Sequence, residues 1–98
     1  MHIKFEWDAA KAKTNLQKHR ISFEDAMSAL IDPFALMKQD RIEGGEQRWQ
    51  TLGMAGGCLV LLVAHLVRED DDGAEIIRII SARAADKKER KSYENQDR

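Results

Sequence analysis

The chain has 98 residues, of which 43% are hydrophobic and 34% charged, and its formal net charge is −1. This length fits one domain over residues 1–98, and the composition excludes an intrinsically disordered chain. The longest apolar run, residues 58–64, is too short to cross a bilayer, and a single cysteine excludes an internal disulfide. Because the first residues also lack the apolar core of a signal peptide, we expect a cytoplasmic protein with no membrane contact.

The chain predicts a short strand and one helix before residue 20. Residues 3–6 have the composition of a strand. Asp8 is a suitable N-cap, and the helix-forming residues after it predict a helix over residues 9–18. Lys18 and His19 end this helix, where cations interact favourably with the helix dipole.

A second helix is predicted to begin at Ser22. Ser22 and Asp25 have the spacing of a capping box, in which each side chain accepts a hydrogen bond from a backbone N–H at the helix start. The helix carries one apolar stripe, made of Phe23, Ala26, Met27, Leu30 and Ile31. Such a stripe predicts packing against a core. Asp32 and Pro33 end the helix, because the residue before a proline disfavours helical geometry.

Period-two patterns after Pro33 predict strands over residues 34–37, 46–54, 58–67 and 75–82. The polar residues 39–45 predict a connection, and residues 70–73 predict a hairpin turn because Asp and Gly tolerate positive φ. Asp86 and Glu89 have the spacing of a second capping box, for a helix running to about Tyr93.

The element order β-α-α-β-β-β-β-α predicts an α+β fold with an antiparallel sheet. The apolar strand segments 59–64 and 76–80 indicate a sheet largely covered on both faces. We expect the two N-terminal helices to cover one face. The short C-terminal helix, or a partner protein, would then cover the other.

Positive charge gathers in the last strand and helix. Residues 78–91 contain six Lys or Arg and two acids, a local charge of +4. Because such residues supply most of the affinity for a nucleic-acid backbone, the segment predicts an RNA or other anion site. The alternative is a solvated helix face, which is the usual meaning of a charge run. The spacing of the histidines and the cysteine indicates no metal site, and no cofactor is predicted.

RNA cleavage without a metal needs a base for the ribose 2′-OH, an acid for the leaving 5′ oxygen, and cations for the charge on the phosphorane. Histidine titrates near neutrality, and arginine binds phosphate through its planar fork. The residues of these types on or beside the predicted sheet are His19, Arg48, His65, Arg78 and Arg83. Strict alternation places Arg78 and Arg83 on opposite faces unless a bulge intervenes.

Each of these candidates has a structural alternative. His65 shares an apolar face of its predicted strand, where a histidine is often part of the core. Arg48 and Arg78 could instead form ion pairs with Glu46 or Glu75. The two tryptophans more often belong to the core than to platforms for stacking bases.

Several motifs resemble the BrnT family of toxins, and together they extend from Phe5 to Glu94. They are Phe5-Glu6-Trp7-Asp8, Lys11, Asn15, Lys18-His19, Ile21-Ser22-Phe23-Glu24, Asp32-Pro33, Arg48, Thr51-Leu52-Gly53, Val63-Ala64-His65, Arg78-Ile79-Ile80-Ser81-Ala82-Arg83, Glu89-Arg90 and Tyr93-Glu94. The resemblance implies a bacterial type II toxin with a RelE-like ribonuclease fold. It further implies an endoribonuclease that halts translation when freed from its antitoxin.

The partner implied by this resemblance is a BrnA-like antitoxin, which binds the toxin tightly and carries the DNA-binding part. The pair would repress its own operon, with operator DNA bound only through the antitoxin, and a hetero-tetramer of two toxins and two antitoxins is expected. A different possibility is a non-catalytic binding or scaffold subunit of a DNA-binding regulatory complex.

The resemblance also ranks the candidate residues. Arg48, Arg78 and Arg83 are expected to be phosphate ligands or transition-state stabilisers. His65 is the expected general acid or base, with His19 as the alternative. The residues expected to contact RNA are Lys18, Lys87, Arg90 and Tyr93.

Overall fold

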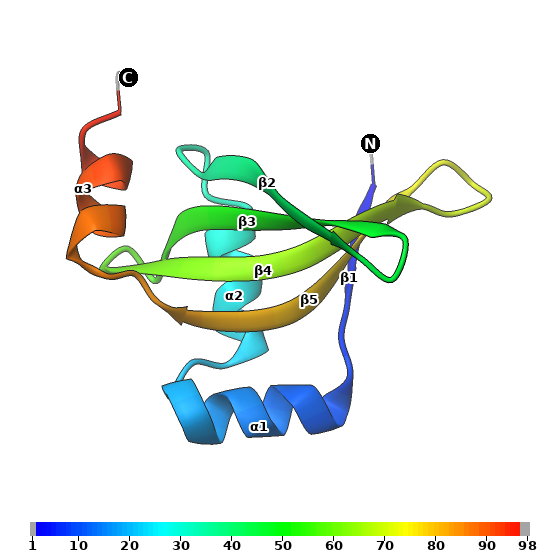
Figure 1. Ribbon diagram of the computed structural model, residues 1–98, viewed down its shortest axis with the longest axis horizontal. Coiled ribbons are helices and arrows are strands. Elements are labelled where there is room, and N and C mark those ends of the chain that lie inside the picture. Colours follow the sequence, from blue (N-terminus) through cyan, green and yellow to red (C-terminus); the bar gives the residue numbers. More distant parts are fainter. Residues whose placement is uncertain (1, 97–98) are drawn as a thin grey trace.

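The computed structural model describes residues 2–96, and its elements follow the predicted order (Figure 1). They are β1 (Ile3–Glu6), α1 (Ala9–His19), α2 (Phe23–Leu30), β2 (Leu36–Glu43), β3 (Glu46–Ala55), β4 (Leu59–Glu69), β5 (Glu75–Ala84) and α3 (Lys87–Glu94). The strands form one five-stranded sheet in the order β1-β5-β4-β3-β2. The predicted α+β fold is therefore confirmed. No helix within residues 2–96 is long and apolar enough to cross a membrane.

The sheet differs from the prediction in two places. β1 pairs with β5 in parallel, so the sheet is mostly rather than wholly antiparallel. Residues 39–43, predicted as part of a polar connection, belong to β2 instead. β2 is an edge strand with β3 as its one neighbour, so its backbone can pair while its polar side chains stay in water.

One face of the sheet packs against α2, which lies behind the sheet in Figure 1. Ser22 supplies one half of the predicted capping box, because its hydroxyl accepts a hydrogen bond from the Asp25 backbone N–H at 3.1 Å, and the return bond to the Asp25 side chain is not formed among the described residues. The core on this face consists of Ile21, Phe23, Ala26, Ala29, Ala55, Leu61, Val63, Ile79 and Ala82. Gly53 allows α2 to approach β3 closely, since a Cβ there would overlap the backbone carbonyl of Ala29.

Asn15 joins α1 to β5. Its buried side-chain amide donates to the Ala82 carbonyl at 2.8 Å and to the Ile21 carbonyl at 3.0 Å, and its oxygen accepts from the Ala82 N–H at 3.1 Å. The amide thus pairs with the backbone of β5 as a neighbouring strand would. This contact holds the last turn of α1, with His19, next to β5.

The opposite face is covered only at one end, by α3. The capping box predicted for this helix is present in both directions: Asp86 accepts from the Glu89 N–H, and Glu89 accepts from the Asp86 N–H. Tyr93 packs with Val60 and Ala85, and its hydroxyl donates to Asp32 in the segment after α2. Among residues 2–96, no helix covers the rest of this face, toward β1 and the C-terminal end of β2 (Figure 1). We call it the open face.

A β-bulge in β5 decides which side chains reach the open face. Ser81 lies opposite Ala64, and Ile79 lies opposite the next residue, His65, so Ile80 is an extra residue in the ladder. One extra residue reverses the alternation of the strand beyond it. As a result, Arg78 lies on the same face as Arg83.

Candidate active site

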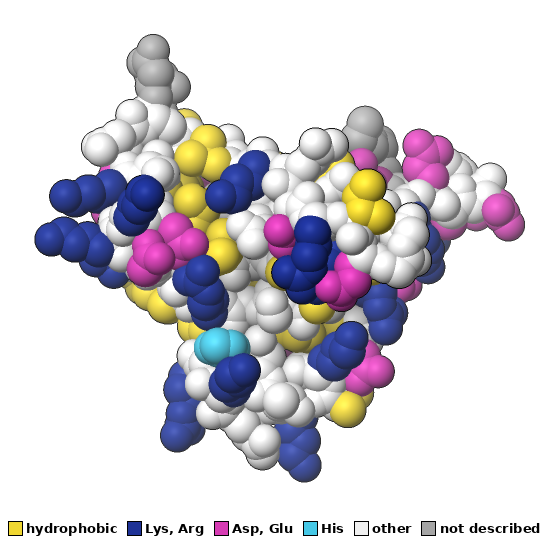
Figure 2. Space-filling model, in the orientation of Figure 1, with side chains coloured by type: hydrophobic (Ala, Val, Ile, Leu, Met, Phe, Trp, Pro, Cys, Tyr) yellow, Lys and Arg dark blue, Asp and Glu magenta, His cyan; other side chains and the backbone are white. Residues whose placement is uncertain are grey.

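The pairing of β3, β4 and β5 places the candidate arginines on the open face and near one another. Arg48 lies opposite Leu66, which in turn lies opposite Arg78. Arg83 lies opposite Leu62, farther toward α3. Figure 2 shows this face, on which Lys and Arg side chains lie beside Asp and Glu side chains.

A polar cleft of about 270 Å³ lies between these positions. Its polar lining consists of His19, Asp40, Arg41, Arg48, Gln50, Ser81 and Arg83, and its apolar wall includes Leu62 and Ala64. We call it the central cleft. It therefore brings together three of the five predicted catalytic residues, from α1, β3 and β5.

Arg48 is the most enclosed cation of the cleft, with 14% of its side chain exposed. One terminal nitrogen donates to Glu43 at 3.2 Å. Its Nε atom is buried and has no hydrogen-bond partner among the described residues. A buried donor without an acceptor is costly, and an anion entering the cleft would supply the missing acceptor.

Arg83 is held in place by α3. Its two terminal nitrogens donate to the two carboxylate oxygens of Glu89 at 2.8 and 3.0 Å. The Arg83 guanidinium lowers the pKa of Glu89, and that carboxylate in turn raises the pKa of Arg83, so the pair stays ionised. Such a bidentate pair fixes the plane of the guanidinium, which orients it at the edge of the cleft.

Arg78 lies in an adjoining cleft on the same face, which Arg68 and Leu66 also line. Both arginines donate to Glu6 of β1, Arg78 at 3.0 Å. The alternative that Arg48 and Arg78 form ion pairs is thus correct in kind. The partners are Glu43 and Glu6, however, and not the predicted Glu46 and Glu75.

His65 lies on the other side of the sheet from the arginines. It is 1% exposed, and its Nε2 atom lies 2.8 Å from the hydroxyl oxygen of Thr51. Burial lowers the pKa of His65 from 6.5 to about 4, which keeps the ring neutral near pH 7. This placement argues against the predicted acid–base role, because the sheet separates the ring from the central cleft. His65 instead has the core position that the structural alternative described.

The residues predicted to contact RNA are dispersed. Tyr93 is buried, and its hydroxyl binds Asp32, so it attaches α3 to the fold. Lys87 and Arg90 are exposed on α3, and Lys18 is exposed near the end of α1 beside His19. Trp7 packs edge to face against Phe23, with ring centroids 5.8 Å apart, as expected for a core residue.

Sequence reasoning missed four polar residues of the cleft, Asp40, Arg41, Gln50 and Ser81, and the role of Glu89 in holding Arg83. Gln50 follows Arg48 by two positions in one strand, so period two predicts that both share a face. The capping box and the Glu89-Arg90 motif both include Glu89, but neither predicts its contact with Arg83. Among residues 2–96, no group of three or more His, Cys, Asp or Glu side chains is arranged to hold a metal ion.

Comparison with known protein families decides the classification. The family model described as "Ribonuclease toxin, BrnT, of type II toxin-antitoxin system" matches residues 7–89. The chain belongs to the BrnT family. This membership confirms the resemblance found in the sequence, and it makes the chain one of the ribonuclease toxins, whose systems include a cognate antitoxin.

A solved BrnT structure supports the fold. The 1.1 Å crystal structure of the ribonuclease toxin BrnT of Brucella abortus is similar to this chain with a TM-score of 0.55 and 24% sequence identity. The similarity covers 89% of this chain and 100% of the other. No curated protein matches the chain in sequence.

Proposed function

We propose that this BrnT protein is an endoribonuclease that cleaves RNA in the central cleft without a metal ion. The observation that carries the proposal is the convergence of His19, Arg48 and Arg83 on one cleft, with the buried Nε of Arg48 lacking an acceptor. A phosphate diester supplies both the negative charge and the acceptor oxygens that these groups require.

In the proposed reaction, the ribose 2′ oxygen attacks the adjacent phosphorus, and the bond to the 5′ oxygen breaks. The products are a 2′,3′-cyclic phosphate and a 5′-hydroxyl. Arg48 and Arg83 would stabilise the negative charge that develops on the phosphorane. His19 would accept the proton of the 2′-OH during the attack and donate a proton to the leaving 5′ oxygen, because histidine can exchange a proton near neutrality. Arg78, in the adjoining cleft, would bind a neighbouring phosphate.

The proposed biological consequence is inhibition of translation in the cytoplasm. A BrnA-like antitoxin would neutralise the toxin in a hetero-tetramer of two copies of each protein. The pair would repress its own operon, with operator DNA bound through the antitoxin alone. The family description supports the existence of an antitoxin partner.

The test is cleavage of a fluorescent RNA by the purified protein in excess EDTA. We expect the wild type to cut the RNA and leave cyclic phosphate ends. His19→Ala and Arg48→Ala should each slow cleavage about a hundredfold or more, because each removes a transition-state interaction. Lys13→Ala is the matched control, since Lys13 is exposed on α1 outside the cleft. Circular dichroism would verify that each variant is folded.

The non-catalytic alternative has one observation in its favour. Arg48, Arg78 and Arg83 each form an ion pair with a carboxylate, as they would in a binding module. That alternative predicts an RNA that stays intact with the wild type. It also predicts that loss of these arginines weakens only the binding of a partner. Absence of cleavage by a folded wild-type protein would therefore reject the proposed ribonuclease mechanism.

A further inference from the structure

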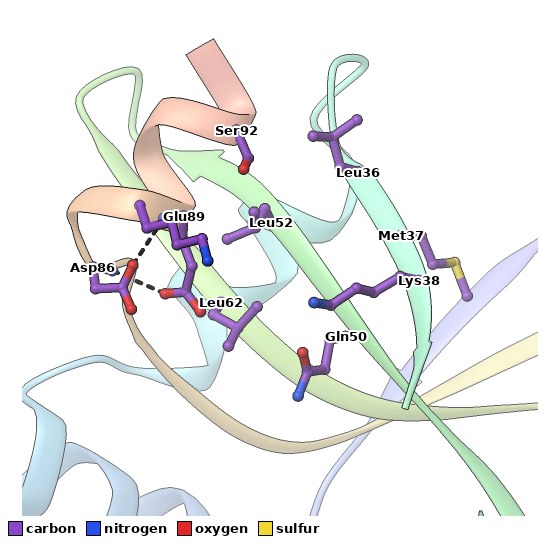
Figure 3. A pocket seen from close by; sticks show the side chains of 10 residues that line it. Leu36, Met37, Lys38, Gln50, Leu52, Leu62, Asp86, Glu89 and Ser92 are labelled. Carbon is purple, nitrogen blue, oxygen red and sulfur yellow. Dashed lines mark hydrogen bonds between the residues drawn. The ribbon is translucent and has the colours of Figure 1, made fainter. Parts of the chain in front are cut away.

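A second cavity lies beside the central cleft, between α3 and the strands β2 and β3 (Figure 3). Its volume is about 390 Å³. We call it the α3 groove. Its apolar floor is formed by Leu36, Leu52 and Leu62. Its polar rim consists of Lys38 and Gln50 on the strands, and Asp86, Lys88, Glu89 and Ser92 at α3.

The α3 groove and the central cleft are contiguous. Gln50 and Leu62 line both of them. Glu89 lines the groove and binds Arg83, which lines the cleft. A nucleotide whose phosphate lies against Arg83 would therefore place its own base, or that of its neighbour, at the α3 groove.

We propose that the α3 groove binds the nucleobase next to the scissile phosphate and that it selects guanine. The inference rests on the proposed ribonuclease function and assigns a base specificity to that site. RNA, rather than a segment of a protein partner, is the proposed occupant, because the groove continues directly into the central cleft and its cations.

The shape of the groove fits a flat ring with polar edges. The three leucine side chains supply an apolar surface for the face of a base, and the polar groups lie around them (Figure 3). The described lining contains no aromatic side chain. Recognition would therefore depend on hydrogen bonds to the edge of the base more than on aromatic stacking.

The arrangement of charges on the rim favours guanine. Lys38 and Lys88 are donors, suited to the O6 and N7 acceptors of guanine. Asp86 and Glu89 are acceptors, and each ionised carboxylate can accept about four hydrogen bonds. In the structure, the Glu89 carboxylate already accepts three, two from Arg83 and one from the Asp86 N–H, whereas the Asp86 carboxylate accepts one, from the Glu89 N–H. Asp86 therefore has the greater remaining capacity to accept from two parallel N–H donors, and among the four bases only guanine presents such a pair, at N1 and N2.

Lys38 and Glu89 face the same space from opposite sides of the groove. The positive charge of Lys38 contributes to lowering the pKa of Glu89, although the Arg83 hydrogen bond is the main cause. A donor and an acceptor that face each other across an apolar floor can contact two edges of one base at once. This geometry identifies Lys38 as a residue that would determine specificity.

The first test maps cleavage sites on an RNA that contains all sixteen dinucleotide steps. We expect the wild type to cut beside guanine at least about fivefold more often than beside other bases, as one well-made base contact predicts. Lys38→Gln should reduce this preference by about threefold or more, through slower cleavage beside guanine. Lys13→Gln is the matched control, since Lys13 is exposed on α1 and lines neither the groove nor the central cleft.

The second test measures binding without cleavage, by NMR of the leucine methyl groups during titration with guanosine 3′-monophosphate. We expect the methyl signals of Leu36, Leu52 and Leu62 to shift more than with uridine 3′-monophosphate. Cleavage without base preference, together with unmoved methyl signals, would overturn the guanine subsite but leave the ribonuclease function intact. Guanine-selective shifts without any cleavage would reject the ribonuclease function and keep the subsite. Shifts produced only by an antitoxin would assign the groove to a protein partner and overturn the proposal.

Discussion

Replacing His65 with glutamine should make the stability of this protein less sensitive to acid. His65 is almost fully buried, and its Nε2 atom lies 2.8 Å from the Thr51 hydroxyl oxygen. Glutamine places an amide near the position of Nε2 and carries no charge at any pH. The variant therefore removes the titration and keeps a polar group beside Thr51.

The magnitude follows from the pKa of His65. Burial lowers this pKa from 6.5 to about 4, so between these values the unfolded chain binds a proton that the folded protein does not. The contribution of His65 to stability is fully present above about pH 6.5 and decreases as the pH falls toward 4. At about 1.36 kcal/mol per pH unit, the wild type should lose roughly 3 kcal/mol over this range from His65 alone.

The assay is urea unfolding of the wild type and of His65→Gln at several values between pH 7 and pH 4. The difference between their unfolding free energies removes the contribution of carboxylates, which both proteins share. We expect this difference to shift by roughly 3 kcal/mol in favour of the variant at low pH. His2→Gln is the control, because it makes the same substitution at an exposed histidine. Equal acid sensitivity of wild type and His65→Gln would refute the burial argument.

Two further predictions concern packing. Gly53→Ala should destabilise the protein by about 3 kcal/mol or more in urea unfolding, because the added Cβ meets the rigid backbone of Ala29. A loss below about 1 kcal/mol would show that α2 can move away. Tyr93→Phe should reduce stability by about 1.5–3 kcal/mol through loss of the hydrogen bond to Asp32, and leave RNA cleavage by the folded protein unchanged. Unchanged stability with slower cleavage would instead support the direct RNA contact predicted from the sequence.

Local signals predicted most of the fold. The apolar stripe and the Ser22 cap located α2, and the spacing of Asp86 and Glu89 located α3, because capping depends on residues within one turn of helix. The parallel pairing of β1 with β5 was missed, since a period-two pattern records which face is buried but not which strand is the neighbour. Residues 39–43 were missed because an edge strand can remain polar.

The candidate site was predictable in chemistry but not in placement. Arginines and a histidine on or beside the sheet were expected, and the structure places His19, Arg48 and Arg83 around one cleft. Period-two alternation placed His65 on an apolar face of its strand, so a core position was correctly given as the alternative for this residue. The sequence could not show which face of the sheet Arg78 lies on, because that depends on the bulge at Ile80. Ile79 and Ile80 are both apolar, so the pattern of the strand does not reveal an extra residue there.

The contact of Asn15 with Ala82 has a consequence for how this sheet meets other chains. β1 pairs with β5 only as far as Arg78, so the backbone groups of β5 beyond that point would form an open edge. Such an edge can recruit a foreign strand and lead to aggregation. The Asn15 amide occupies the N–H and carbonyl of Ala82, which closes this stretch to an incoming strand. A partner or second copy that extends the sheet by backbone pairing would then pair with an outer strand, β1 or β2, rather than with this stretch of β5.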